Sequence, residues 1–135
     1  MKSTRKFFVR TYECDSYSHV NNAVYLNYLE AGRYEFLKDI GFDYNAAVGD
    51  GYGMYIARVE IDYKKPAFVD DELTIETWPL KTGAVSGIVG QKITRGSDII
   101  IDAKVTWAFV DKSGTPAKMP EKYSVAGFKP ENLNL

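Results

Sequence analysis

The 135-residue sequence has very little of what marks a secreted, metal-binding or nucleic-acid-binding protein. Its single cysteine allows no internal disulfide, and its single histidine argues against a zinc site built on imidazoles and thiolates. With 17 basic and 18 acidic side chains the formal net charge is −1, without the basic excess that nucleic-acid binders normally carry. We therefore expect no nucleic-acid partner, no metal and no cofactor.

Long apolar runs, linkers, repeats and low-complexity tracts are lacking as well. No stretch approaches the roughly 20 apolar residues of a membrane span, and the basic residues 1–10 lack the apolar run of a signal peptide. The remaining composition, 45% apolar and 26% charged, is that of an ordinary folded protein. The sequence thus predicts one domain over residues 1–135, a cytoplasmic location and no membrane association.

Hydrophobic periodicity predicts an α+β fold with one long helix. Residues 6–13 read as a first strand, and residues 22–40 as a helix apolar on most of its circumference, which is typical of a buried helix ending at Gly41. A period of two then predicts strands at 55–65, 73–78, 85–94 and 99–110, with a hairpin turn at 95–98. The simplest packing curls an antiparallel sheet of about five strands around the helix. Residues 120–135 predict only a short helical turn or coil.

The most informative segment is Cys14-Asp15-Ser16-Tyr17-Ser18-His19-Val20-Asn21-Asn22, directly before the long helix. A helix N-terminus presents unpaired backbone N–H groups that can hold an oxyanion, and Asp15 and His19 stand near it as candidate base, nucleophile or orienting group. A structural interpretation remains open, in which Asn21 and Asn22 cap the helix and the other polar residues shape the loop. Catalysis by Cys14 is disfavoured, because adjacent strand residues point to opposite faces.

Two stretches resemble the hot-dog-fold acyl-CoA thioesterases, and the 4-hydroxybenzoyl-CoA thioesterase-like family in particular. The first runs from Tyr12 through the His-Val-Asn-Asn sequence to the mid-helix Glu30-Ala31-Gly32-Arg33, and the second covers residues 59–67 with the Asp-Asp-Glu-Leu that follows at 70–73. The chain departs from the pattern twice. Ser18 stands where the family usually has glycine, and Tyr17 stands where related acyl-carrier-protein thioesterases have asparagine.

The resemblance implies a hot-dog fold and an acyl-CoA thioesterase that hydrolyses a thioester to a free acid and CoA. It implies that Asp15 acts as nucleophile or general base and that the backbone N–H of Asn22 polarises the thioester carbonyl. His19 either assists the chemistry or only holds the loop. It also implies a homodimer, or a homotetramer built as a dimer of dimers, with sheets paired edge to edge and active sites at the interface.

Other residues have two interpretations each. Glu30 and Arg33 lie three apart on the helix and are expected to form an ion pair. The tyrosines and phenylalanines either line an acyl tunnel or fill the core, as for Tyr52, Tyr55 and Phe68. Candidate cations for the CoA phosphates are Lys64, Lys65, Lys81 and Arg95.

Two alternative functions remain. A hot-dog enoyl-thioester hydratase or dehydratase fits less well, because those families space the Asp–His pair one residue further apart and include a proline that is absent here. A non-catalytic acyl-thioester binding protein is favoured only by the altered Tyr17-Ser18 sequence. The acyl group, and the choice between CoA and acyl-carrier-protein esters, are left open by the sequence.

Overall fold

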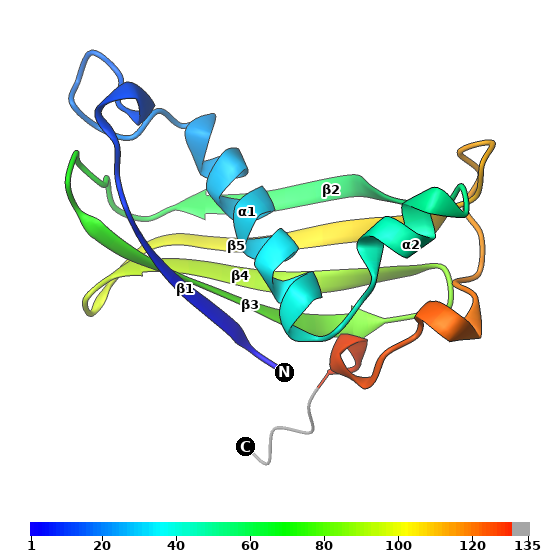
Figure 1. Cartoon of the computed structure of the whole chain (residues 1–135). Coiled ribbons are helices and arrows are strands. Elements are labelled where there is room, and N and C mark those ends of the chain that lie inside the picture. The colour runs from blue at the N-terminus through cyan, green and yellow to red at the C-terminus, as the bar shows by residue number, and fades with distance from the viewer. Residues whose placement is uncertain (131–135) are drawn as a thin grey trace.

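The computed structural model describes residues 1–130 and contains a five-stranded antiparallel sheet with one long helix lying across its face (Figure 1). The sheet order is β1-β3-β4-β5-β2. The strands are β1 (Ser3–Phe8), β2 (Gly53–Tyr63), β3 (Glu72–Thr82), β4 (Ser86–Arg95) and β5 (Asp98–Val110). The long helix is α1 (Val24–Asp39). The α+β architecture expected from the sequence is confirmed, and β1 and β2 form the two edges of the sheet.

Several element boundaries differ from the expectation. The first strand ends at Phe8, and residues 11–13 form the 3-10 turn η1 (Thr11–Glu13) instead of more strand. The short helix α2 (Tyr44–Gly49) was not predicted, because six residues carry too little periodicity; the Asp43 side chain caps it by accepting from the Ala46 N–H at 3.0 Å.

The tail forms two further 3-10 turns, η2 (Glu121–Tyr123) and η3 (Ala126–Phe128), as the expectation of short helical turns or coil allowed. The last five residues of that segment, 131–135, lie outside the described residues. Of the helices within residues 1–130, none is long and apolar enough to cross a membrane.

The helix α1 is buried on one face only, so the expectation of a helix buried around most of its circumference is wrong for the single chain. Its buried residues follow a three-to-four spacing that faces the sheet: Tyr25, Tyr28, Leu29, Gly32 and Phe36. Leu26 and Tyr34 on the other face remain 45% and 52% exposed. Gly41 ends the helix as expected, with φ +78° and an N–H that donates to Lys38 O.

Gln91 on β4 is fully buried where α1 crosses the middle of the sheet. Its Nε2 donates to the helix carbonyl of Leu29 at 2.9 Å and to Thr77 Oγ1 at 3.0 Å, while its Oε1 accepts from Arg33 at 3.1 Å. A buried amide is stable only when its donors and acceptors are satisfied, and here the helix and the sheet satisfy them together. This network fixes the height of α1 above the sheet.

Gly32 allows the close approach of α1 to this network. A Cβ at this position would lie 2.6 Å from Ile75 Cδ1 and 3.1 Å from Gln91 Nε2. Gly32→Ala is therefore expected to lower the free energy of unfolding by about 1–2 kcal/mol, because overpacking outweighs the gain in helix propensity. Urea unfolding measures the change, with Gly49→Ala as the control because no atom lies within 4 Å of a Cβ at that position. A more stable Gly32→Ala protein would contradict the close packing.

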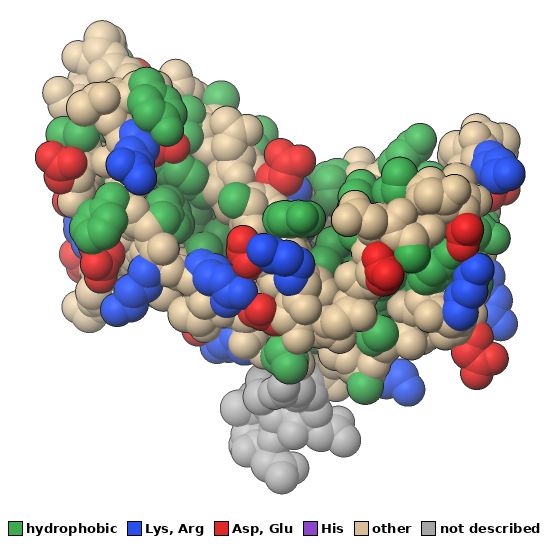
Figure 2. All heavy atoms as spheres, viewed as in Figure 1, with side chains coloured by type: hydrophobic (Ala, Val, Ile, Leu, Met, Phe, Trp, Pro, Cys, Tyr) green, Lys and Arg blue, Asp and Glu red, His purple; other side chains and the backbone are tan. Residues whose placement is uncertain are grey.

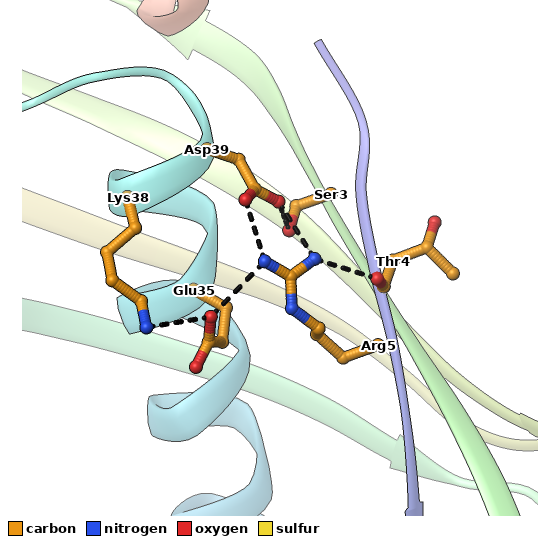
Figure 3. Close-up of polar contacts among 6 residues, drawn as sticks. All are labelled: Ser3, Thr4, Arg5, Glu35, Lys38 and Asp39. Atoms are coloured by element: carbon orange, nitrogen blue, oxygen red, sulfur yellow. Dashed lines mark hydrogen bonds and ion pairs between the residues drawn. The ribbon is translucent and has the colours of Figure 1, made fainter.

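The edge strand β1 is tied to the C-terminal half of α1 by a polar network (Figure 3). Arg5 contacts Asp39 through two hydrogen bonds of 2.7 and 3.0 Å and Glu35 through one of 3.2 Å. Ser3 Oγ also donates to Asp39, at 2.6 Å. The hydrogen bonds from Arg5 and Ser3 hold the pKa of Asp39 below its usual value. One edge of the sheet is thus fastened to the helix, whereas the outer residues of β2 at the other edge are largely exposed.

Candidate active site

The polar segment before α1 forms a tight loop, the Asp15 loop (residues 14–22), at one end of the sheet (Figure 1). The Asp15 N–H donates to His19 O at 2.8 Å and the Ser18 N–H donates to Asp15 O at 3.0 Å, while Val20 is anchored by its N–H to Ala67 O at 2.9 Å. Ser18 has φ +65°, a left-handed conformation that favours glycine. Ser18 therefore adopts a backbone conformation that favours glycine, the residue that stands at this position in the pattern it resembles.

Asp15 has one carboxylate oxygen fixed and one available. Its Oδ1 accepts from the Tyr17 N–H at 2.9 Å, which is the loop-shaping contact of an Asx turn. Within residues 1–130, no hydrogen bond reaches the second oxygen, and the residue is partly exposed. The structural and the catalytic interpretation are therefore compatible, because the first oxygen holds the side chain while the second can face a substrate.

His19 lies in the same turn, but its side chain is not hydrogen-bonded to Asp15. Its backbone pairs with Phe68, and its ring packs edge-on against the Phe68 ring with centroids 5.0 Å apart. No hydrogen bond to the imidazole is formed by any residue of the described chain. The backbone thus brings Asp15 and His19 together, whereas a catalytic role for the imidazole stays a prediction.

The start of α1 is not capped by the side chains of Asn21 and Asn22 in the way that the structural interpretation of the sequence expects. The N-cap residue is Ala23, which has no capping side chain; Asn21 Oδ1 instead accepts from the Ala23 N–H at 2.9 Å. Asn22 does not cap the helix, and its carbonyl accepts from Tyr63 Oη at 3.1 Å. The Asn22 N–H makes no hydrogen bond within residues 1–130. A backbone donor is thus available beside the positive end of the helix dipole.

Cys14 is poorly suited to be a nucleophile. It follows the 3-10 turn η1 and packs, half-buried, against the hydrophobic core rather than lying within a strand. Burial, with the nearby charges of Asp15 and Glu13, raises the pKa of its thiol and so disfavours the reactive thiolate. The non-catalytic interpretation holds, although the reason is burial and charge rather than strand alternation.

A cavity of about 480 Å³ lies beside α1, between this helix, α2, the first half of β2 and inward-facing residues of β4 and β5. Figure 2 shows this side of the molecule hollowed between the end that carries the Asp15 loop and the end that carries α2, with hydrophobic side chains in the hollow. The lining is mainly apolar and aromatic: Asn27, Glu30, Ala31, Arg33, Tyr34, Phe36, Leu37, Tyr44, Met54, Ile56, Val89, Trp107 and Phe128. Such a lining suits an apolar ligand.

The expected ion pair between Glu30 and Arg33 is not formed. Arg33 Nη1 donates to Gln91 Oε1 at 3.1 Å, and Glu30 affects Arg33 only through its electric field. Burial lowers the pKa of Arg33, and the negative charge of Glu30 partly offsets this effect. The reason for the difference is the fully buried Gln91, which offers the guanidinium an acceptor that helix periodicity does not reveal.

The structure narrows the other candidate residues. Arg95 is bound to Asp71 and Lys65 to Asp98, both at 2.8 Å, which leaves Lys64 and Lys81 as the exposed candidates that form no ion pair in the described part of the chain. None of the predicted tunnel aromatics, Tyr52, Tyr55 and Phe68, lines the cavity. Among residues 1–130, no cluster of three His, Cys, Asp or Glu side chains could hold a metal ion.

Comparisons with known proteins identify the family and agree with the fold. The model of the thioesterase-like superfamily matches residues 9–126. Long-chain acyl-CoA thioesterase FadM of Escherichia coli K12 is 32% identical over 105 residues, which cover 76% of this chain and 79% of that protein. The chloroplastic acyl-acyl carrier protein thioesterase ATL3 of Arabidopsis thaliana is 29% identical over 114 residues, or 83% of this chain and 60% of that protein. The crystal structure of a probable thioesterase from Bartonella henselae aligns with a TM-score of 0.83 at 27% identity, covering 89% of this chain and all (100%) of that one.

Proposed function

The chain belongs to the thioesterase-like superfamily and is a thioester hydrolase, and we propose that it hydrolyses acyl-CoA esters through Asp15 at a site completed by a second copy of the chain. The observation that carries the proposal is that one loop contains both groups. The Asp15 carboxylate is held by one oxygen and has the other without a hydrogen bond, and the Asn22 N–H just before α1 makes no hydrogen bond within residues 1–130. The relatedness to an acyl-CoA thioesterase supports CoA as the thiol.

Asp15 can act in either of two ways. As nucleophile, its free oxygen bonds to the thioester carbon and the C–S bond breaks, so that CoA leaves and water then hydrolyses the acyl anhydride. As general base, it takes a proton from a water that attacks the same carbon. In both cases the carbonyl oxygen becomes negative, and we expect the Asn22 N–H to stabilise it, an interaction worth about 10²–10³ in rate. His19 is proposed to assist by orienting the attacking group.

The edge strand β2 supports a two-fold dimer. Its exposed side chains include Tyr55, and Ile56, Val59 and Tyr63 on the face of the sheet that carries α1; they are 58%, 46%, 36% and 51% exposed. An exposed apolar edge strand of eleven residues is rare in a monomer, because its unpaired backbone groups invite another strand. Antiparallel pairing of β2 with its copy would bury this edge and join the two sheets.

This pairing would also assemble the site. The Asp15 loop lies near the last residue of β2, where Tyr63 contacts Asn22, whereas the cavity lies at the opposite end, lined by Met54 and Ile56. Antiparallel pairing about a two-fold axis sets the end of one β2 beside the beginning of the other. The Asp15 loop of one copy would then face the cavity of its partner, and the cavity would receive the acyl group.

A thiol-release assay tests the proposed activity. The purified protein is expected to release CoA from at least one member of a panel of short-chain, long-chain and aromatic acyl-CoAs, and the ranking reports the shape of the cavity. Release from acyl-carrier-protein esters alone would move the proposal toward the activity of the plant relative. Binding of acyl-CoA without release would favour a binding protein, and hydration of an enoyl-CoA would favour the hydratase alternative.

The cytoplasmic location stays a prediction. The sequence feature that suggests it is the single cysteine. The name of the plant relative places that protein in the chloroplast. The homodimer or dimer of dimers is likewise proposed, and light scattering of the purified protein distinguishes the two.

A further inference from the structure

The cavity has a polar wall, and we propose that Arg33 makes it selective for acyl groups that carry a neutral hydrogen-bonding oxygen, a hydroxyl or a carbonyl, away from the thioester. The inference rests on the proposed function, because it treats the cavity as the acyl site. It concerns the cavity rather than the Asp15 loop, so it can fail while thioester hydrolysis stands.

The argument begins with the donors of Arg33. A guanidinium has five N–H donors and stays charged in proteins. Within residues 1–130 only one of its hydrogen bonds is present, from Nη1 to Gln91 Oε1 at 3.1 Å. Arg33 is partly buried, and this burial lowers its pKa. Gln91 thus anchors one side of the guanidinium while other donors stand in the wall of the cavity.

An acyl chain that fills the cavity must replace the water around these donors. Most of the neighbouring lining is apolar or aromatic, including Phe36, Val89 and Trp107. A saturated chain would remove water from the guanidinium and offer no acceptor, whereas an oxygen on the chain would restore the hydrogen bond. Sites that hydrogen-bond a substrate group reject analogues that lack it, because the buried donor is then left unpaired.

The charge of Glu30 indicates what kind of oxygen fits. Glu30 lines the same cavity, and its field acts on Arg33 without forming an ion pair. The two opposite charges leave no net positive charge for a carboxylate on the acyl group to neutralise. A hydroxyl can accept from Arg33 and donate to Glu30, and a ketone can accept from Arg33. Both groups satisfy the hydrogen-bond donors of Arg33 without adding an anion beside Glu30.

The experiment measures binding and hydrolysis separately. Isothermal titration compares the non-hydrolysable thioethers S-dodecyl-CoA and its 3-, 6- and 12-hydroxy derivatives, and thiol release compares the matching thioesters. The wild-type protein is expected to bind at least one hydroxylated thioether about ten-fold or more tightly than the plain one. Arg33→Met replaces the side chain by a shorter, flexible apolar one without donors, and it should remove this preference while still binding the plain thioether.

A second variant keeps the test valid if Arg33→Met fails to fold. Arg33→Lys retains the charge but loses the planar fork, so it is expected to keep only part of the preference. Equal or tighter wild-type binding of plain S-dodecyl-CoA, an unchanged preference in Arg33→Met, or no binding of any thioether would overturn the inference. Hydrolysis of the thioesters without discrimination would leave the proposed function intact and reject only the role of Arg33.

Discussion

Asp15→Asn is expected to lower the rate of acyl-CoA hydrolysis by at least about 10²–10⁴-fold, because a neutral amide can neither attack the thioester nor take a proton from water. The amide oxygen can still accept from the Tyr17 N–H, so the loop should keep its conformation. Binding of a non-hydrolysable CoA thioether should change little. The measurement is thiol release for turnover, with titration calorimetry for binding.

Asp70→Asn is the matched control for this variant. Asp70 is exposed and lies two residues after Phe68, which pairs with His19 of the loop. Its φ is +67°, a conformation that asparagine tolerates. Asp70→Asn removes one negative charge near the site and should leave turnover unchanged.

His19→Ala is expected to lower turnover less than Asp15→Asn does. Near wild-type turnover by Asp15→Asn would show that Asp15 is not the catalyst. A loss of turnover in His19→Ala as large as that in Asp15→Asn would show that the imidazole is essential.

Val59→Lys is expected to convert the proposed dimer to a monomer and to reduce hydrolysis more than about ten-fold, since a symmetric interface contains each introduced charge twice. Val59 lies near the middle of β2, opposite the fully buried Val105 of β5 and so on the face of the sheet that carries α1, and it remains 36% exposed. If the two-fold axis passes close to this position, the two introduced lysines would repel each other, and the substitution adds no acidic residue to pair with them. Light scattering reports the oligomeric state, and thiol release reports the activity of the same sample.

Leu80→Lys provides the control for Val59→Lys. Leu80 is an exposed aliphatic residue of β3, 40% exposed, and β4 and β5 separate its strand from β2 in the sheet. The same introduced charge should leave both the dimer and the activity intact. Thermal unfolding of both variants shows whether the single chain remains folded. A folded, monomeric Val59→Lys with full activity would mean that one chain holds a complete site.

The order of the helices and strands could be predicted from the sequence because it depends on local hydrophobic periodicity. Strand alternation from residue 55 onward and the stop at Gly41 are confirmed, because each depends on neighbours in the chain. The fold of the Asp15 loop was accessible only through the resemblance. Ser18 in a left-handed conformation is not what its own residue type favours, and tertiary contacts such as Val20 N–H to Ala67 O hold it there.

The errors arise where a distant residue decides the outcome. Arg33 was assigned to Glu30 because they lie three apart on a helix, but the fully buried Gln91, 58 residues later, provides the acceptor. Asn22 was a candidate cap in the structural interpretation only, and this alternative is wrong because Tyr63 binds its carbonyl and Asn21 accepts from the Ala23 N–H. The cavity could not be predicted because its lining comes from α1, β2, β4, β5 and the tail together. No local pattern encodes such a combination.

A mixed-dimer measurement tests most directly whether the Asp15 loop of one copy works with the cavity of the other. Asp15→Asn inactivates the loop, and Ala31→Trp is designed to fill the cavity beside α1. The two chains carry different affinity tags and are co-expressed, so that the heterodimer can be isolated and compared with each variant homodimer. The heterodimer then holds one site made of an intact loop and an intact cavity from different chains. We predict that it hydrolyses acyl-CoA at about half the wild-type rate per dimer, while both homodimers are inactive. A heterodimer no more active than the two homodimers would contradict the shared site.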